Sequence, residues 1–110
     1  RFLGEVYVTG NTNESDPLQL FIKQGEEAVL QCLYESDQLL WDARKNVNIG
    51  RTTIAVGKDT VNGTKYKVSP KPSTVVYYRL HVLNVQPGDE LIYRCVAGVN
   101  KKHFIQLNLY

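Results

Sequence analysis

The sequence predicts an all-β fold, a sandwich of about nine short strands held together by one disulfide. Three observations predict it: strand-like runs separated by turn residues, apolar side chains that alternate with polar ones along those runs, and two cysteines at inward positions. Seven Tyr and no Met agree with strands, because aromatic side chains suit a pleated surface. A chain of 110 residues has room for one core, so residues 1–110 are predicted to form a single domain.

Polar and turn-forming residues divide the first half of the chain into short runs. Alternation in the third run puts Ala28, Leu30 and Cys32 on one face, which we expect to be the inward face. In the next run Leu39 and Trp41 point inward, and Trp41 is large enough to fill much of the core. We predict strands at positions 5–9, 18–23, 27–33, 38–43, 47–51 and 53–56, the last two being short edge strands.

The second half opens with a turn-rich loop at positions 57–64. Further strands are predicted at 66–69, 76–83, 91–97 and 104–110, with the turn Gln86-Pro87-Gly88-Asp89 before the third of them. The side chains predicted to face inward on these strands are Tyr78, Leu80, Val82, Leu91, Tyr93, Cys95, Ala97, Ile105, Leu107 and Leu109.

The two cysteines, Cys32 and Cys95, both fall on inward positions of their strands. In a small chain of this kind, the pair predicts a disulfide, and the alternative is two unrelated buried thiols. Closing so long a loop contributes about 4 kcal/mol to stability on the chain-entropy model. We therefore expect the disulfide to supply a large share of the domain's stability.

Two aromatic residues stand at characteristic distances from the cysteines. Trp41 follows Cys32 by nine positions, and Tyr93 lies two positions before Cys95 within Asp89-x-Leu91-x-Tyr93-x-Cys95. On these residues the chain resembles the immunoglobulin superfamily over nearly its whole length. The resemblance implies that Trp41 packs against an inter-sheet disulfide and that the Tyr93 hydroxyl bonds to upstream backbone as a tyrosine corner.

Within that superfamily the chain looks most like a variable-like or intermediate-set domain. In such domains the Asp at the position of Asp89 pairs with a basic residue at the start of strand D. Here that strand is the one predicted at 66–69, and Lys65 stands directly before it. Most such domains have Arg, whose planar fork holds a carboxylate bidentately as Lys cannot. Leu91 also stands where a small residue is usual, so we expect this corner to pack differently.

One stretch narrows the resemblance further. Trp41-Asp42-Ala43-Arg44 is unlike the corresponding run of antigen-receptor variable domains, and positions 103–110 lack their Phe/Trp-Gly-x-Gly signature. The segment Tyr78-Arg79-Leu80-His81-Val82-Leu83-Asn84-Val85-Gln86, with Asp89 and Tyr93-Arg94-Cys95 after it, is similar to the first domain of lachesin and of the related Dpr, DIP and IgLON groups. That similarity implies a neuronal cell-surface receptor that pairs through one sheet face.

Charge and hydropathy limit the partners. A formal charge of +2 is too weak to indicate nucleic acid, and Lys101-Lys102-His103 is interpreted as a solvated turn rather than a phosphate site. No run approaches the roughly 20 apolar residues that a membrane span requires. Because the chain opens at Arg1-Phe2-Leu3 without a signal-peptide pattern, we expect a processed extracellular segment whose membrane contact, if any, lies outside it.

Two tripeptides match the acceptor pattern for N-linked glycans. They are Asn13-Glu14-Ser15 and Asn62-Gly63-Thr64, each within a predicted polar loop. The alternative is that both asparagines are ordinary turn residues. The sequence therefore predicts a glycoprotein with Asn13 and Asn62 as its candidate sites.

The residues for catalysis are sparse. His81 and His103 fall on different predicted strands with no paired acid in sight, and both cysteines are committed to the disulfide. Two histidines without free thiolates do not make a zinc site, and no Gly-rich phosphate loop is present. We expect no enzyme, no metal and no cofactor.

Side chains alternate between the two faces of a strand, and we call the face that a residue occupies its strand parity. This parity indicates which residues the core does not need. In the notation of the immunoglobulin fold, the strands predicted at 104–110, 91–97, 38–43 and 47–51 would be G, F, C and C′ of one sheet. Three apolar residues on neighbouring strands of that sheet, Leu40, Val96 and Phe104, are predicted to face outward. Contiguous apolar side chains ringed by polar ones are typical of an interface. The predicted partner-binding residues are Leu40, Asp42, Val47, Ile49, Arg94, Val96, Phe104 and Gln106, with Phe104 and Leu40 as apolar anchors and with Arg94 and Asp42 as polar selectors.

These expectations combine into one leading function with two alternatives. The chain is expected to be the extracellular module of an adhesion or recognition receptor, which pairs with a second copy as a homodimer or with another immunoglobulin-type receptor. One alternative is a soluble immune or ligand-capture module that binds through the loop at 98–103. The other is a structural immunoglobulin module of an intracellular protein, whose thiols would stay reduced.

Overall fold

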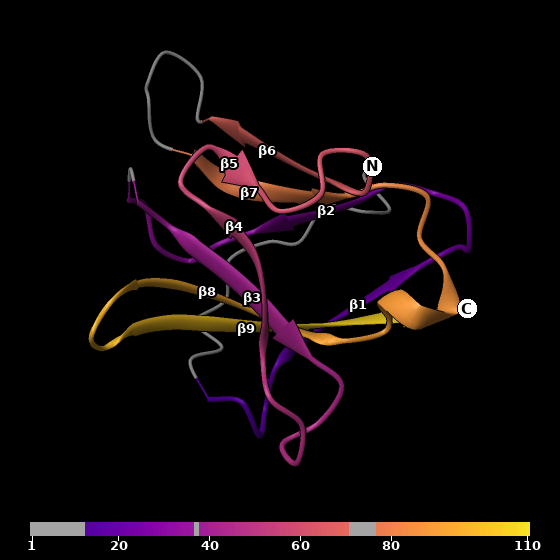
Figure 1. The fold of residues 1–110 in the computed structure, drawn as a ribbon. Coiled ribbons are helices and arrows are strands. Elements are labelled where there is room, and N and C mark those ends of the chain that lie inside the picture. Colours follow the sequence, from indigo (N-terminus) through magenta and orange to yellow (C-terminus); the bar gives the residue numbers. More distant parts are fainter. Residues whose placement is uncertain (1–12, 37, 71–76) are drawn as a thin grey trace.

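The computed structural model describes residues 13–36, 38–70 and 77–110, which fold into two facing sheets (Figure 1). Six strands form one sheet in the order β1-β9-β8-β3-β4-β5, and three form the other in the order β2-β7-β6. The strands of this described part are β1 (Leu18–Ile22), β2 (Ala28–Gln31), β3 (Leu40–Arg44), β4 (Thr52–Val56), β5 (Asp59–Thr60), β6 (Tyr66–Pro70), β7 (Tyr77–Val82), β8 (Ile92–Gly98) and β9 (Lys101–Leu109), with a 3-10 turn η1 at Pro87–Asp89.

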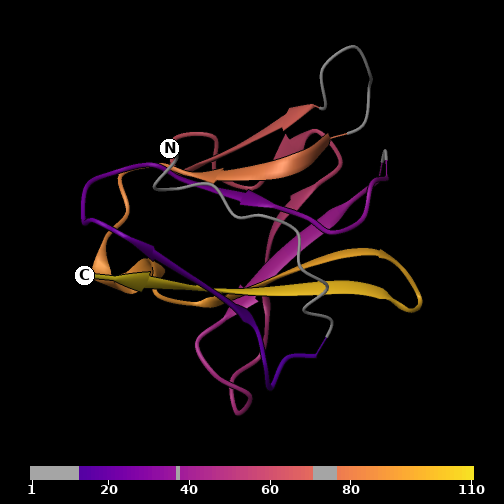
Figure 2. The ribbon, with the colours of Figure 1, turned by 180° about the vertical axis from the view of Figure 1, so that it is seen from behind.

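Among the strands that the structure describes, neighbours are antiparallel except for one pair. β1 runs parallel to β9, with Leu18 opposite Ile105 and Ile22 opposite Leu109, and the two strands lie side by side in Figure 2. Antiparallel neighbours such as β8 and β9 are joined by a tight turn, whereas a parallel pair needs a long connection. Here the connection is nearly the whole domain, so β1 and β9 bring the two ends of the fold together.

The predicted alternation buries the inward set between the sheets. Trp41, Tyr93, Leu30 and Ile105 are each at most 1% exposed, and the other inward residues of the described part are either buried or packed against this core. Tyr78, whose side chain was also predicted to face inward, and the strand predicted at 5–9 lie outside what the structure describes. The residues that the period-2 pattern placed inward thus belong to the core or pack against it wherever they can be compared.

A disulfide joins the two sheets across this core. Cys32 directly follows β2, Cys95 lies in the middle of β8, and their Cα atoms are 6.0 Å apart. Trp41 on β3 stands directly opposite Cys95 in the β3–β8 register. Nine strands in two sheets, closed by this disulfide beside a buried Trp, make the fold an immunoglobulin-like β-sandwich.

The predicted corner forms at the start of β8. The Tyr93 hydroxyl donates to the backbone oxygen of Asp89 at 2.9 Å, and burial raises the pKa of Tyr93. Lys65 Nζ lies 2.5 Å from Asp89 Oδ2 and also donates to the carbonyl oxygens of Leu83 and Asn84. Because Lys cannot grip the carboxylate with two donors, it spreads its three donors over the carboxylate and the end of β7.

Two predicted segments differ from the structure. Positions 47–51 form no strand, because Asn46 Oδ1 accepts the Asn48 N–H at 2.9 Å and the chain turns there between β3 and β4. The predicted loop at 57–64 contains the short edge strand β5, paired with the end of β4. Both errors arise in polar edge segments, where side-chain alternation carries little information.

The predicted solvated turn at Lys101-Lys102-His103 is also wrong. These residues open β9 and pair with Cys95, Val96 and Gly98, so the turn lies at Val99 and Asn100.

In the described ranges, no helical segment has the length and apolarity that a membrane crossing needs.

Candidate partner-binding face

The outer face is the side of the six-stranded sheet that points away from the three-stranded sheet. Register across β4, β3, β8 and β9 arranges it in three rows. The first row runs through Val56, Leu40, Val96 and Lys102, the second through Asp42, Arg94 and Phe104, and the third through Arg44, Ile92 and Gln106. All the predicted face residues except Val47 and Ile49 are brought together in these rows.

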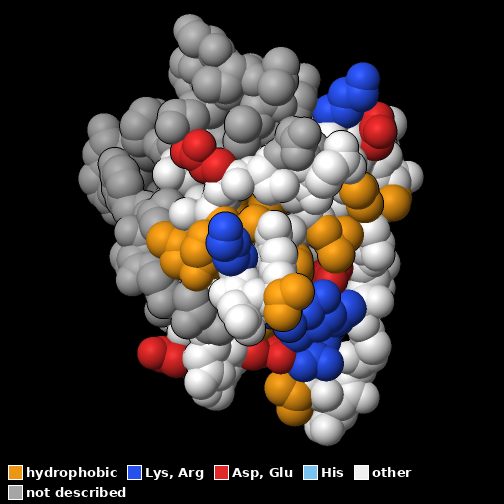
Figure 3. Space-filling model, turned by 90° about the vertical axis from the view of Figure 1, so that its left-hand side faces the viewer, with side chains coloured by type: hydrophobic (Ala, Val, Ile, Leu, Met, Phe, Trp, Pro, Cys, Tyr) orange, Lys and Arg blue, Asp and Glu red, His pale blue; other side chains and the backbone are white. Residues whose placement is uncertain are grey.

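Three of the four residues in the first row are apolar and at least partly open to solvent. Val56 is 45% exposed, and Leu40 and Val96 on the next two strands are partly exposed. We call Val56, Leu40 and Val96 the apolar row. Figure 3 shows a side of the molecule on which hydrophobic side chains lie directly beside a compact group of basic ones. Leu40 and Val96 were predicted for this surface, whereas Val56 was missed because the strand at 53–56 was not assigned to the face.

The second row is built on an ion pair. Arg94 Nε donates to Asp42 Oδ1 at 3.0 Å and Nη2 donates to Oδ2 at 2.5 Å, so the guanidinium holds the carboxylate bidentately. Asp42 is only 4% exposed, and Arg51 Nη1 lies 3.7 Å from its Oδ1. The prediction that Asp42 and Arg94 share this face is confirmed, but Asp42 is turned inward to two arginines and presents little of itself to a partner.

Phe104 is not the exposed anchor that strand parity predicted. It stands opposite Arg94 on the outer face, yet it is 5% exposed, and the Arg51 guanidinium lies 5.6 Å from its ring centre. A guanidinium stacks on an aromatic face because the ring's negative quadrupole attracts the cation. Parity predicts the side of the sheet on which a residue lies, but it cannot show what covers that residue.

Glu14 completes a group that we call the ion cluster: Asp42, Arg94, Arg51, Arg44 and Glu14. Its carboxylate accepts from Arg44 Nε at 2.7 Å and pairs with Arg51 Nη2 at 2.8 Å. The hydrogen bond from Arg44 and the charge of Arg51 hold the pKa of Glu14 below its usual value. Glu14 was not predicted for this site because it lies far from the arginines in the chain and its only recognisable pattern there is the glycan acceptor Asn13-Glu14-Ser15.

Val47 and Ile49 do not extend the apolar row. They are 63% and 47% exposed on the turn between β3 and β4, where their carbonyl oxygens accept from Arg44 Nη1. This turn lies at the opposite end of β3 from Leu40. Ile49 instead helps to line a depression of about 280 Å³, whose other lining residues include Ile54, Tyr66 and Leu91.

Gln106 belongs to a set of linked amides at the β1 edge of the face. Its Oε1 accepts from Gln19 Nε2 at 3.0 Å, and Asn108 Nδ2 donates to Gln19 Oε1 at 2.9 Å. These bonds bridge the parallel pair β1 and β9. Gln106 therefore belongs to a polar border on the side of the face away from β4.

His81 has a paired acid, contrary to the sequence-based prediction. On the outward side of the three-stranded sheet, its Nδ1 lies 2.6 Å from Glu27 Oε2 and its Nε2 lies 2.8 Å from Ser69 Oγ. A Ser-His-acid order is that of a hydrolase triad. None of the three lines the depression described above, and each stands on or beside a different strand, so we interpret them as a link across β6, β7 and β2.

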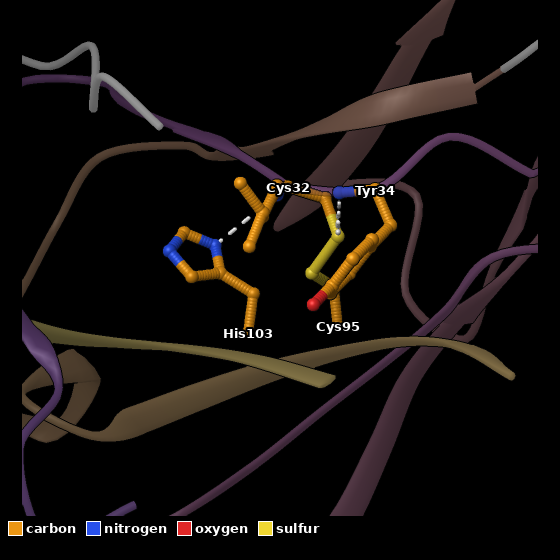
Figure 4. Close-up of a disulfide and its surroundings, with 5 residues drawn as sticks. Cys32, Tyr34, Cys95 and His103 are labelled. Atoms are coloured by element: carbon orange, nitrogen blue, oxygen red, sulfur yellow. Dashed lines mark hydrogen bonds between the residues drawn. A yellow bond between two sulfur atoms is a disulfide. The ribbon is translucent and has the colours of Figure 1, made fainter. Parts of the chain in front are cut away.

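His103 is buried beside the disulfide (Figure 4). It stands opposite Cys95 on β8, is 0% exposed, and its Nδ1 accepts the Leu33 N–H at 3.2 Å. The proton of the neutral ring therefore sits on Nε2, which is buried and has no hydrogen-bond partner among the described residues. Burial lowers the pKa of His103 to about 4, so His103 is a core residue and cannot serve a ligand-binding loop.

No family model matches the sequence, and no curated protein matches it. The immunoglobulin-like architecture therefore rests on the strand order, the Cys32–Cys95 disulfide and the corner at Tyr93.

Proposed function

We propose that this chain is the extracellular protein-binding module of a cell-surface recognition receptor, and that it pairs through its outer face with a second immunoglobulin-type domain. The single observation that carries the proposal is the partly exposed apolar row beside the ordered ion cluster. Apolar side chains that the core does not use, bordered by fixed polar groups, make up the centre and rim of a typical protein interface.

The ion cluster suits partner selection because most of its charges are already paired. Each described acid of the cluster touches two arginines, so the side chains are held before any partner arrives. Groups ordered in advance lose less conformational entropy on binding. The apolar row would supply the binding energy, and the arginine edges that stay exposed would discriminate between partners.

A second copy of the chain is the first candidate partner. In a two-fold pair each face meets the same face, so the apolar row of one copy can cover the apolar row of the other. The cluster contains both charge signs, which lets like charges avoid each other across the two-fold axis. A different immunoglobulin-type receptor with a matching row is the heterophilic form of the same proposal.

The two alternatives make different demands on the molecule. The disulfide between Cys32 and Cys95 favours an oxidising compartment over the cytosol. Measuring the mass of the domain with and without reductant therefore tests the intracellular alternative, in which the thiols would stay reduced. A ligand-capture loop at 98–103 has little structure to use, because strands β8 and β9 leave only Val99 and Asn100 between them.

The test compares two substitutions in the apolar row with a matched control elsewhere. Self-association is measured by sedimentation across concentration, and tetramers of the domain are used to stain cells that display the same chain or a panel of immunoglobulin-type ectodomains. Leu40→Glu and Val96→Glu are expected to weaken binding about tenfold or more. Val61→Glu, at a residue 65% exposed in the turn after β5, should leave it unchanged.

Two results would overturn the proposal. One is the absence of association in both formats. The other is equal weakening by the Val61 control and the row substitutions. Circular dichroism of each variant, unchanged from the parent domain, excludes loss of fold as the cause.

A further inference from the structure

Both glycan acceptor patterns of the sequence form the same local structure. In each, the Asn side-chain oxygen accepts two hydrogen bonds from the residue two positions on. Asn62 Oδ1 accepts Thr64 N–H at 3.1 Å and Thr64 Oγ1 at 2.7 Å, and Asn13 Oδ1 accepts Ser15 N–H at 3.0 Å and Ser15 Oγ at 2.9 Å. The sequence pattern therefore coincides with a hydroxyl bonded to the side-chain amide at both places.

Among the described residues, the hydrogen bonds of both turns go to the side-chain oxygen and not to the reactive nitrogen. Because the side-chain oxygen is bound into the turn, Nδ2 lies on the other side of the carbonyl carbon, and no described residue forms a hydrogen bond with it at Asn13 or Asn62. Both asparagines are exposed. A bulky, soluble glycan on Nδ2 would extend into solvent without disturbing either turn.

The two sites differ in their relation to the outer face. Asn13 precedes Glu14, whose carboxylate binds Arg44 and Arg51 at the end of the face that is away from the apolar row. Arg44 and Leu40 are four residues apart on β3, roughly 13 Å at about 3.3 Å per residue. Asn62 lies in the turn between β5 and β6, beyond the edge of the six-stranded sheet.

We propose that Asn13 and Asn62 both carry N-linked glycans, and that the Asn13 glycan borders the ion-cluster end of the outer face and leaves the apolar row open. In the modification, the bond between C1 of a lipid-pyrophosphate-linked oligosaccharide and its phosphate oxygen breaks. A bond from C1 to Nδ2 forms, one amide proton is lost, and the lipid pyrophosphate leaves. The statement about the apolar row rests on the proposed pairing, whereas the two acceptor assignments stand without it.

Occupancy is tested first. The chain is secreted from animal cells, and its intact mass is measured before and after enzymatic removal of N-linked glycans. The parent chain is expected to lose two glycans, while Thr64→Ala and Ser15→Ala each lose one. Thr64→Ser keeps the hydroxyl and should keep its glycan, and Thr60→Ala, a nearby Thr outside both patterns, should keep both. A parent mass equal to that of the bare polypeptide, or one unchanged by Thr64→Ala, would overturn the assignments.

The position of the glycans is tested with an engineered third one. Lys58→Asn creates Asn-Asp-Thr in the exposed turn two residues after Val56, at the open end of the apolar row. Its glycan is expected to reduce association about tenfold or more, whereas removing the native glycans should change association less than about twofold. The variant Lys58→Asn with Thr60→Ala lacks the new pattern and should pair like the parent.

These outcomes separate the two proposals. Absent native glycans overturn the glycan assignments and leave the pairing proposal intact. A glycosylated Lys58→Asn variant that pairs normally contradicts the use of the apolar row. If removing the native glycans alters pairing as strongly as adding the new one, the placement of the Asn13 glycan is wrong.

Discussion

Burial determines the protonation state of His103 and the free energy that is needed to protonate the ring in the folded domain. The ring sits opposite Cys95 in the core, and the backbone N–H of Leu33 already occupies Nδ1, the atom that a second proton would bind. The two lysines that precede His103 led to the prediction of a solvated turn. Pairing of those lysines with β8 extends the strand and carries His103 inward by parity.

We predict that stability falls as the solution is acidified through the range between the two pKa values of His103. The unfolded ring takes up a proton near its ordinary pKa of 6.5, but the folded ring does so only near about 4. The contribution of His103 to the free energy of unfolding is therefore fully present above about pH 6.5, declines towards pH 4 and levels off below it. The total loss is about 3 kcal/mol at most.

Urea unfolding at a series of pH values measures this decline. His103→Gln, which keeps an acceptor for Leu33 N–H, should remove most of it. An unchanged decline in the His103 variant would contradict the prediction.

At the scale of strands, the outer face shows which parts of the site could be predicted from sequence. Alternation put Leu40, Asp42, Arg94, Val96 and Phe104 on the correct side of their strands. It could not predict the cover over Phe104, because Arg51 comes from a turn that was taken for a strand. Contacts between distant segments, such as Glu14 with Arg44 or Glu27 with His81, leave no periodic signal in the chain.

The Asp42–Arg94 pair between β3 and β8 should be costly to break and cheap to replace. Asp42→Ala leaves the Arg94 guanidinium largely desolvated without its bidentate partner, and we expect a loss of roughly 3 kcal/mol. The double variant Asp42→Leu, Arg94→Leu removes both charges and should recover most of that loss. Chemical denaturation of both single variants and the double variant gives the coupling energy, and simple additivity would contradict the prediction.

For the whole molecule, four residues carried most of the prediction. The sandwich could be identified from residues that link the two sheets or pack between them, namely Cys32, Trp41, Tyr93 and Cys95. The structure places all four in the core. The same reasoning does not extend to the partner, since packing inside one domain places no requirement on the side chains of its outer surface.

Removing the disulfide should weaken the whole domain and leave its architecture unchanged. Replacing Cys32 and Cys95 with Ala and Val is expected to lower the free energy of unfolding by about 4 kcal/mol, because the unfolded chain gains freedom. A typical domain of this size has only about 5 to 15 kcal/mol. Thermal unfolding of the parent and the variant measures the difference, and a change below about 1 kcal/mol would be inconsistent with this account.

The parallel pairing of β1 with β9 has a mechanical consequence. Force applied between the start of β1 and the end of β9 pulls the two strands along their length in opposite directions, so the ladder from Leu18–Ile105 to Ile22–Leu109 is loaded in shear. Its hydrogen bonds must then yield together, whereas an antiparallel hairpin pulled at its open end would unzip bond by bond. In single-molecule stretching we expect one abrupt rupture, and Leu20→Pro, which removes a backbone donor from β1, should lower the rupture force. A receptor that holds two surfaces together would bear tension across this pair of strands.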